Sequence, residues 1–335
     1  MSDLTISVIM PAYNAAHLME RVLPPLMKML QDGEIEEVLV VDDQSTDTTV
    51  EVAKNFGAKV MVTPQNGGPG VARNLASRQA VGDILWFVDS DVIAMPGGPA
   101  LIKAAFADDK VGAAFGSYDD APEGSWFSRY KNLLHRFHHQ NAGAEASTWW
   151  AGCGAIRAST FAAVGGFDVE TYRVPSIEDI ELGYRIKAAG GAIRVIPEWQ
   201  GKHLKRWSMK NAIFTDIFRR ALPWSRLMIA REGLTNELNA GTSERIRALI
   251  AGVLVLSLFG NILGLVGIGA TLLVFLVAIL ANWKLASFFW RSGGPGLALG
   301  AMAYHQLYYL YSAASYVWCL FEYHVLGIKN RLHVP

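Results

Sequence analysis

Apolar residues in the first part of the chain form short continuous runs, separated by segments in which they recur every three or four positions. A short apolar run predicts a strand with both faces buried, and the wider spacing predicts a helix. Strands and helices that alternate in this way predict βαβ units around a mostly parallel sheet. The predicted fold class is therefore α/β and Rossmann-like. The runs that predict strands lie at residues 4–10, 37–41, 58–62, 84–88, 111–117 and 192–196.

The pattern changes after residue 207. Residues 208–229 are rich in aromatic and basic side chains and contain Pro223, which predicts two short helices lying in a membrane interface, or else an ordinary packed pair. No charged residue occurs between Ala248 and Trp283, a run about 50 Å long as a helix, whereas a bilayer core is ~30 Å thick. A hairpin of two spans is expected, with one long helix as the alternative. About three spans are predicted, near residues 247–264, 266–283 and 297–321.

Basic residues flank these apolar segments. Arg245 and Arg247 precede the first span, and Lys284 and Arg291 lie between the second and third, so the positive-inside rule places both groups in the cytoplasm. The N-terminus has no basic region followed by an apolar run, so no signal peptide is expected. We therefore expect a multi-pass protein of the cell (inner) membrane whose first domain is cytoplasmic. The expected parts are an α/β domain at residues 1–207, amphipathic interfacial helices at 208–245 and a transmembrane domain at 246–335.

Composition narrows the classes of function. Lys and Arg balance Asp and Glu at 30 each, which gives no electrostatic reason to expect a nucleic acid partner. The two cysteines, Cys153 and Cys319, form neither a metal signature nor a disulfide scaffold. His135, His138 and His139 share a predicted helix. His135 and His139 lie four positions apart on one face, but a metal site there would need another ligand, and solvated histidines near an acceptor cleft are the alternative.

Two carboxylates, Asp89 and Asp91, follow the apolar run at 84–88, with Ser90 between them. Open α/β sheets bind ligands at the carboxyl ends of their strands. Carboxylate oxygens at this spacing can converge on one hard cation, such as Mg²⁺ or Mn²⁺, with phosphate oxygens completing its shell. The other interpretation is a surface turn, for which Asp-Ser-Asp is well suited.

Polar loops also follow the first two predicted strands. Because both loops leave carboxyl ends of strands, they can form one pocket, and a carboxylate there can accept a hydrogen bond from a base N–H such as that of uracil. Asp42 and Asp43 belong to the second loop. The first loop consists of Pro11, Ala12, Tyr13 and Asn14.

Two further patterns carry chemistry. A glycine loop that ends at Gly70 leads into a helix with Arg73, and backbone amides at a helix start plus a guanidinium can bind a diphosphate. Glu178 and Asp179 stand at the start of another predicted helix. One of this acidic pair can serve as a general base, or the pair can simply favour the helix dipole.

Taken together, these motifs resemble glycosyltransferase family 2, the inverting enzymes with a GT-A fold, over roughly residues 4–207. The resemblance implies that Asp43 or Asp42 contacts the nucleotide base, that Asp91 is the direct metal ligand with Asp89 beside it, and that Asp179 is the base. The motifs that carry it, in chain order, are Pro11–Asn14, Asp42–Asp47, Val71–Asn74, Asp89–Asp91, Ala151–Gly154 and Glu178–Asp179.

Members of this family that act at membranes carry Gln-x-x-Arg-Trp, and this chain has His203-Leu204-Lys205-Arg206-Trp207. The resemblance implies that Arg206 neutralises the leaving diphosphate and that Trp207 stacks on the acceptor. The histidine in place of glutamine departs from the pattern of processive polymer synthesis. Polyprenyl-phosphate sugar transferases are also similar, since membrane helices follow their catalytic domain.

The expected function is transfer of a sugar from a nucleoside-diphosphate sugar, taken as a UDP-sugar, to a lipid-linked or membrane-proximal glycan acceptor. A divalent cation and membrane lipids are the other expected partners, and a homo-oligomer could form through the membrane helices. One alternative is a polyprenyl-phosphate sugar synthase, whose acceptor is a phosphate. Another is an inactive protein that binds nucleotide sugars. A transporter subunit is disfavoured, because the spans carry no paired intramembrane charges.

Overall fold

The computed structural model describes residues 4–231 and 241–329, and the chain divides into two compact units. The described residues of the sheet unit are 4–124 and 139–206. The helical unit consists of Ser125–His138 and Trp207–Leu332. Residues 125–138, which the sequence assigned to the first domain, thus group with the later helices.

The sheet unit contains one eight-stranded mixed sheet in the order β3-β2-β1-β4-β7-β6-β8-β5. β1 lies parallel to β2 and β4, whereas β7 runs antiparallel to β4 and β6. The predicted α/β Rossmann-like sheet is confirmed. Its strands are β1 (Ile6–Ala12), β2 (Glu37–Asp42), β3 (Lys59–Val62), β4 (Ile84–Val88), β5 (Val92–Ala94), β6 (Val111–Tyr118), β7 (Cys153–Arg157) and β8 (Ala192–His203). Its helices are α1 (Ala16–Gln31), α2 (Thr49–Asn55), α3 (Pro69–Ser77), α4 (Gly98–Phe106), α6 (Ala158–Ala163) and α7 (Glu178–Ala188).

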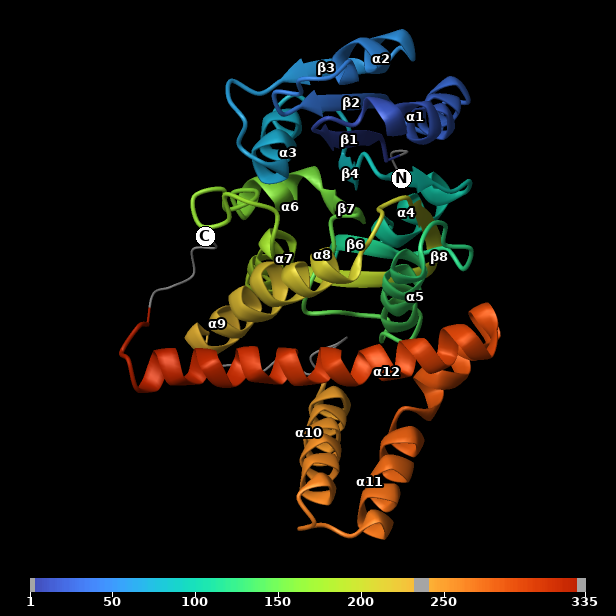
Figure 1. The fold of residues 1–335 in the computed structure, drawn as a ribbon. Coiled ribbons are helices and arrows are strands. Elements are labelled where there is room, and N and C mark those ends of the chain that lie inside the picture. The colour runs from blue at the N-terminus through green and yellow to red at the C-terminus, as the bar shows by residue number, and fades with distance from the viewer. Residues whose placement is uncertain (1–3, 232–240, 330–335) are drawn as a thin grey trace. The chain divides into compact units, whose positions relative to one another are not determined.

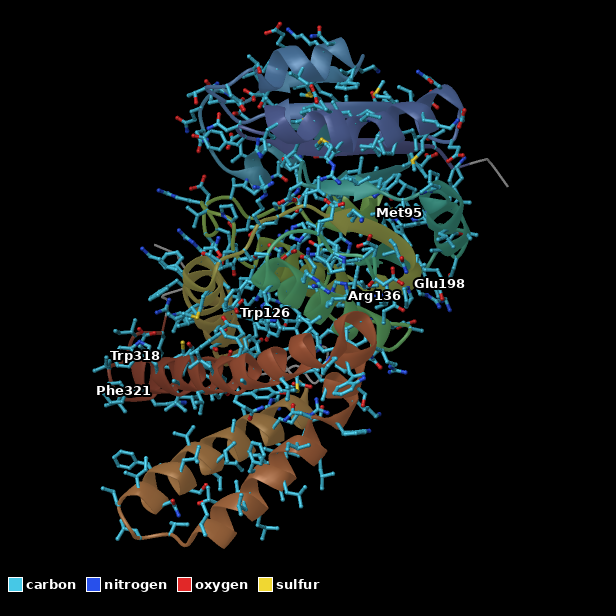
Figure 2. The ribbon with its side chains drawn as sticks, turned by 45° about the vertical axis from the view of Figure 1, so that its right-hand side comes forward. Met95, Trp126, Arg136, Glu198, Trp318 and Phe321 are labelled. Carbon is cyan, nitrogen blue, oxygen red and sulfur yellow. The ribbon has the colours of Figure 1, made fainter. Side chains whose placement is uncertain are left out.

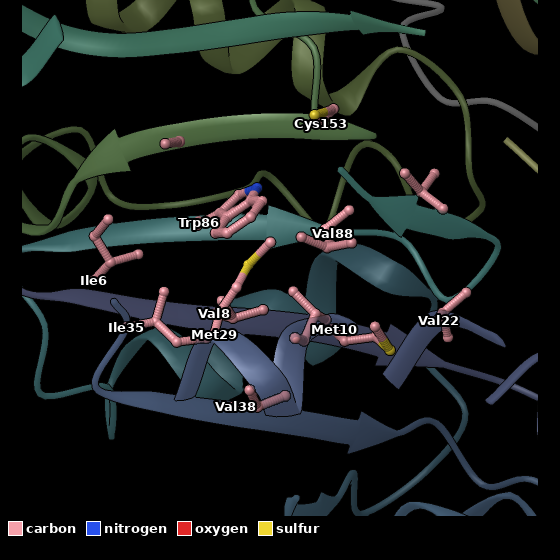
Figure 3. Close-up of a cluster of buried hydrophobic side chains, with 14 of the residues drawn as sticks. Ile6, Val8, Met10, Val22, Met29, Ile35, Val38, Trp86, Val88 and Cys153 are labelled. Carbon is pink, nitrogen blue, oxygen red and sulfur yellow. The ribbon is translucent and has the colours of Figure 1, made fainter. Parts of the chain in front are cut away.

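Alternate residues of the central strands pack into separate clusters on the two faces of the sheet. In β4, Ile84, Trp86 and Val88 belong to one cluster, and Leu85 and Phe87 belong to the other. Helices α1 and α4 supply the first cluster, part of which Figure 3 shows, and α3, α6 and α7 supply the second. Because both faces are covered, the central strands β1 and β4 are buried along their whole length.

The helical unit begins with α5 (Trp126–Gln140), whose last two residues lie outside it, and continues through α8 (Met209–Phe214), a π-helix η1 (Thr215–Ala221) and α9 (Leu222–Ala230). α8, η1 and α9 follow one another directly, with helical backbone angles at Ala221, so Pro223 does not separate two short helices as the sequence predicted. The unit ends with α10 (Thr242–Ile262), α11 (Ile268–Ala281) and α12 (Trp283–His324). In Figure 1, α10 and α11 form a hairpin and α12 runs across its base.

Apolar packing and a buried ion pair join α5 to the rest of the helical unit. Tyr130 and Leu133 of α5 share a buried cluster with Phe289 of α12. Lys131 Nζ lies 2.6 Å from Asp216 Oδ1, and both side chains are almost fully buried. Tyr311 donates to the other oxygen of Asp216 at 2.8 Å, so this buried charge is well satisfied. These contacts explain why α5 groups with the C-terminal helices.

Among the described residues, α10 is one helix long and apolar enough to cross a bilayer. Helices α11 and α12 meet the same criterion only as a pair, and they are bent by 66° at the break between them. The described helices thus offer one or two candidate spans, fewer than the three expected. The third expected span, 297–321, lies within α12.

Gly183 provides a test of how α7 is held. A methyl group there would lie 2.4 Å from the backbone nitrogen of Trp149, so only glycine permits this approach. We expect Gly183→Ala to lower the stability by about 1–3 kcal/mol through overpacking. Thermal unfolding of the detergent-solubilised chain measures the loss.

Gly143→Ala is the matched control, because its new methyl group would lie 3.6 Å from its nearest neighbour, an ordinary contact. An unchanged melting temperature in Gly183→Ala would contradict the close packing of α7.

Candidate active site

The loops after β1 and β2 are joined to each other by hydrogen bonds. Ala12 and Asp42, the last residues of these strands, are partners in the parallel register. Beyond them, the Asn14 backbone N–H donates to Ser45 Oγ at 2.8 Å, and Asn14 Oδ1 accepts from the Thr46 N–H at 2.8 Å. Asn14 adopts a left-handed φ of 51°, which a short polar side chain tolerates. The structure therefore brings together the two loops that the sequence predicted would form one pocket.

Asp47, the last acidic residue of the second loop, has a structural role. Its Oδ2 accepts from the Ala16 N–H at 3.2 Å, and its Oδ1 accepts from the Thr49 N–H at 3.0 Å. Burial alone would raise the pKa of Asp47, but these hydrogen bonds outweigh it and hold the pKa below its ordinary value. Asp47 thus fastens the start of α1 to the start of α2.

Asp42 and Asp43 differ in what they bind. Both oxygens of Asp43 are used: Oδ1 accepts from Thr63 Oγ1 at 2.8 Å and Oδ2 accepts from the Gly68 N–H at 2.7 Å. Asp42 Oδ2 accepts from the Ser45 N–H at 3.0 Å, while its buried Oδ1 has no hydrogen-bond partner among the described residues. Asp43 therefore shapes the glycine loop, and contact of either carboxylate with a base stays a prediction.

The residues of the first loop differ in burial. Pro11 and Ala12 are buried at the end of β1, whereas Tyr13 exposes 54% of its surface. An exposed aromatic ring beside a polar pocket can stack on a planar base.

Arg73 is buried at the carboxyl end of the sheet. Its Nη2 lies 2.5 Å from Asp89 Oδ1, and its Nη1 lies 3.8 Å from Glu178 Oε1. The guanidinium also lies over the Phe167 ring, 5.3 Å from the centroid. Its Nε and Nη1 have no hydrogen-bond partner among the described residues. The sequence expected Arg73 to bind a diphosphate, and the structure places it between two carboxylates with donor capacity to spare.

The helix that carries Arg73 is fixed by its neighbour Asn74. Asn74 Oδ1 accepts from the Phe167 N–H, and its Nδ2 donates to the Phe167 carbonyl, each at 2.9 Å. A methyl group on Gly70 would lie 3.3 Å from Val169, so α3 packs tightly on the 167–169 segment. Gly70 and Asn74 therefore position Arg73.

Asp91 faces a residue that the sequence did not connect with it. His203 Nε2 lies 3.5 Å from Asp91 Oδ2, because β5 pairs antiparallel with the end of β8, with Val92 opposite His203. The Leu204 N–H also donates to the Asp91 carbonyl at 2.7 Å. Burial would raise the pKa of Asp91, but His203, with help from Lys205, outweighs it and lowers the pKa.

Asp91 and His203 offer the donors that a divalent cation needs. An oxygen and a nitrogen ligand suit Mn²⁺, and Mg²⁺ at nucleotide sites is held by one or two carboxylates plus phosphate oxygens. In the described part of the chain no group of three or more His, Cys, Asp or Glu side chains could hold a metal. A cation held by two protein side chains alone would need further oxygen ligands from a bound molecule. Asp89 is already paired with Arg73, and Ser90 lies between the two carboxylates.

His203 is part of a small aromatic cluster in the sheet unit. The Tyr118 ring stacks on the His203 ring at 4.5 Å, with an interplanar angle of 7°. Trp150 meets Tyr118 edge-on at 4.7 Å and also contacts His139 at 4.7 Å. The stacking fixes the plane of the imidazole and so the direction of Nε2. It also places His139 among aromatic rings.

Glu178 and Asp179 open α7, as predicted, but they have different environments. Asp179 is half-buried, and its Oδ2 accepts from the Ala151 N–H at 3.1 Å. Glu178 is buried, and its Oε2 accepts from the Ser176 N–H at 2.7 Å. Burial raises the pKa of Glu178 to about 7, the Asp179 charge adds to the effect, and Arg73 opposes it. Glu178 can therefore hold a proton near neutral pH.

Arg206 and Trp207, the last predicted site residues, are assigned to different units. Arg206 is exposed at the end of the sheet unit. Trp207 is buried in the helical unit. Its backbone N–H donates to Ser128 Oγ at 2.9 Å, and Lys131 Nζ lies 5.4 Å from the centroid of its ring. His135 Nε2 lies 2.9 Å from Arg220 Nη1 in the same unit. Stacking of Trp207 on an acceptor stays a prediction.

Comparison with known proteins identifies the family. The profile described as Glycosyl transferase family 2 matches residues 7–164. Validoxylamine A glucosyltransferase from Streptomyces hygroscopicus subsp. jinggangensis is 30% identical over 234 residues, which cover 58% of this chain and 54% of that protein. The chain spans about half or less of the length of the curated relatives it matches.

Two solved structures share the fold. The structure of S. aureus TarS 1-349 with UDP aligns at a TM-score of 0.50 and 22% identity, covering 68% of this chain and 65% of that chain. Mannosyltransferase PcManGT from Pyrobaculum calidifontis, in complex with GDP-Man and Mn²⁺, aligns at a TM-score of 0.55 and 18% identity, covering 95% of this chain and 88% of that chain. The neighbours thus agree with the family profile on a GT-A fold. The chain therefore carries a glycosyltransferase family 2 domain at residues 7–164.

Proposed function

We propose that the chain is a membrane-bound inverting glycosyltransferase that moves a sugar from a nucleoside-diphosphate sugar to a lipid-linked or membrane-proximal glycan acceptor. The observation that carries the proposal is the pair of Asp91 and His203, 3.5 Å apart, at the carboxyl end of the sheet of a family 2 domain. Structures of TarS with UDP and UDP-GlcNAc support a UDP-sugar as donor. The apolar α10 and the paired α11 and α12 support attachment to a membrane.

A divalent cation, Mg²⁺ or Mn²⁺, would be held by Asp91 and His203 and would supply positive charge for the departing diphosphate. The Mn²⁺ in the PcManGT structure supports this assignment. Arg73 carries donors not used by the described residues and adds positive charge beside Asp89. Exposed Arg206 is proposed to approach the same leaving group.

Asp179 is the proposed general base. It takes the proton from an acceptor hydroxyl, the freed oxygen bonds to the anomeric carbon, and the bond from that carbon to the diphosphate breaks on the opposite face. The Ala151 N–H, 3.1 Å from Oδ2, orients the carboxylate.

The proposal as a whole is tested by incubating the purified chain with Mn²⁺ and a panel of UDP- and GDP-sugars, in the presence of membrane lipid. Release of the nucleoside diphosphate and mass spectrometry of the lipid products report transfer. If no nucleoside-diphosphate sugar binds, the enzyme proposal fails, and an inactive membrane protein becomes the better description.

Asp179→Asn tests the acceptor chemistry. Loss of the base should reduce kcat at least about 10²-fold if the acceptor is a hydroxyl. Release of the nucleoside diphosphate under saturating donor measures the change. Glu170→Gln is the matched control, since Glu170 is an exposed carboxylate in a surface ion pair with Arg173. Nearly full activity of Asp179→Asn would contradict the assignment of Asp179 as the base and favour a phosphate acceptor, which needs no base.

His203→Gln tests the metal ligand set and restores the residue type of the related motif. Glutamine lacks the imidazole nitrogen, so the Mn²⁺ concentration for half-maximal activity should rise at least about tenfold. A titration of activity against Mn²⁺ measures the shift. An unchanged metal requirement would show that His203 is no ligand.

Glu178→Gln tests the raised pKa. The pKa of the Glu178 carboxyl is about 7 in the folded chain, against an ordinary value of 4.5. Its contribution to the stability of the fold is therefore fully present below pH 4.5 and is lost as the pH rises through 7. Glutamine stays neutral at both pH values. The free energy of unfolding of the variant, relative to that of the native chain, should therefore be higher at pH 8 than at pH 5, by up to about 3 kcal/mol. Thermal unfolding at the two pH values checks the sign, and a difference independent of pH would contradict it.

A further inference from the structure

The hairpin of α10 and α11 exposes apolar side chains around most of its circumference. Val255, Leu256, Leu258 and Phe259 are all exposed, although they point in different directions around α10. An ordinary surface helix exposes a polar face and buries an apolar stripe. The side chains in Figure 2 project outward from both helices of this hairpin. Apolar exposure on all sides fits a surrounding hydrocarbon phase better than a partner protein, which would cover one face.

The tip of the hairpin, residues 263–267, has the sequence Leu-Gly-Leu-Val-Gly and no polar side chain. Leu265 at its centre is 79% exposed. A hairpin that crosses a bilayer presents its tip to water on the far side, where charged, Trp or Tyr residues usually anchor it. This tip has none of them.

Polar groups near the tip are used within the hairpin. Asn261 Nδ2 donates to the Val266 carbonyl at 3.0 Å, and the Leu265 N–H donates to the Gly260 carbonyl at 2.8 Å. Further along the hairpin, Thr271 Oγ1 donates to the Ser257 carbonyl at 3.2 Å. Internal hydrogen bonds of this kind are what a turn needs where water is scarce.

The base of the hairpin is polar and held to α12. The Tyr309 hydroxyl lies 2.9 Å from Glu244 Oε2 and 3.0 Å from Asn282 Oδ1 and can donate its one proton to either, which joins α12 to both ends of the hairpin. Arg247 Nε donates to the Ala281 carbonyl at 2.9 Å and closes the base. Trp283, which is exposed, follows directly. Basic and tryptophan side chains at one end only suit the headgroups of one leaflet.

Although α10 as a whole is long enough to cross a bilayer, the uncharged part of the hairpin is shorter than the hydrocarbon core. The uncharged part of α10, from Ala248 to Ile262, is about 22 Å long, and the 14 residues of α11 extend about 21 Å, against a hydrocarbon core of ~30 Å. If α11 stands near the membrane normal, the 66° bend before α12 exceeds the usual tilt of a spanning helix, which is up to about 40°. The backbone of α12 is not helical at Gly293 and Gly294, and beyond this break α12 runs across the base of the hairpin in Figure 1. α12 then lies along the interface.

From these observations we propose that α10 and α11 form a re-entrant hairpin, which enters the bilayer from the side of the sheet unit and returns without crossing it. Its tip lies in hydrocarbon, its basic base meets anionic headgroups, and α12 lies along the same interface. This arrangement rests on the membrane attachment proposed above, and it replaces the multi-pass topology expected from the sequence. It makes the chain a monotopic protein.

A cysteine at the tip tests the arrangement. The full chain with Leu265→Cys is reconstituted into vesicles of phosphatidylethanolamine and phosphatidylglycerol and treated with a membrane-impermeant maleimide outside, inside or on both sides. We expect no labelling at the tip from either side and full labelling after detergent, because a thiol in hydrocarbon neither ionises nor meets the reagent. Background is measured on the unsubstituted chain, whose two cysteines are buried.

Two matched cysteines define the sides. Asp109→Cys replaces a fully exposed residue of the sheet unit, and Trp290→Cys replaces an exposed residue near the base of the hairpin. Both should be labelled from the same side. Labelling of Leu265→Cys from the opposite side would overturn the re-entrant arrangement in favour of a crossing.

Flotation of the vesicles separates this inference from the proposed function. A chain that floats with vesicles but is labelled at the tip from the far side keeps the membrane attachment and loses the re-entrant hairpin. A chain that does not float loses both. Labelling of the tip from the same side as Asp109→Cys would show that the hairpin stays in water, which also overturns the proposal.

Discussion

The buried guanidinium of Arg73 is the constraint around which the candidate site is arranged. A cation removed from water must be paired, and Arg73 is paired with Asp89 after β4 and with Glu178 at the start of α7. The Phe167 ring covers it, and Asn74 holds the same segment through two hydrogen bonds. Three elements that are far apart in the chain are thereby held at one edge of the sheet. A single arginine is thereby paired with the carboxylates of both Asp89 and Glu178.

The carboxylates at this edge share one chemistry and differ in their surroundings. Asp43 and Asp47 accept several backbone or hydroxyl donors and therefore serve the architecture of the loops. Asp91 faces an imidazole and suits a cation. Asp179 keeps part of its surface open beside buried Glu178, and two acidic groups with different burial can divide the acid and base roles. The donors around each carboxylate thus decide its role.

Buried polar contacts define the helical unit in the same way. Lys131 and Asp216 pair out of water with Tyr311 beside them, and Arg226 donates to the Glu322 carboxylate from Nε and Nη2. These contacts join α5, η1 and α9 to α12. The cost of desolvating each charge is offset only when all partners are present, so the set favours a single arrangement of these helices. A rigid base of this kind suits a hairpin whose own surface is apolar.

The sequence by itself determined the α/β class, the strand ends at which the chemistry gathers, and the apolar hairpin, because apolar periodicity and turn residues are local signals. Four matters depended on contacts between distant residues. Pairing of β5 with β8 brought His203 to Asp91, although the sequence showed His203 only as a replacement for glutamine. Close packing at Gly183, the grouping of α5 with α12, and the 66° bend before α12 were equally invisible to local pattern. Periodicity predicts which faces are buried, whereas the partner that buries each face is decided by the tertiary structure.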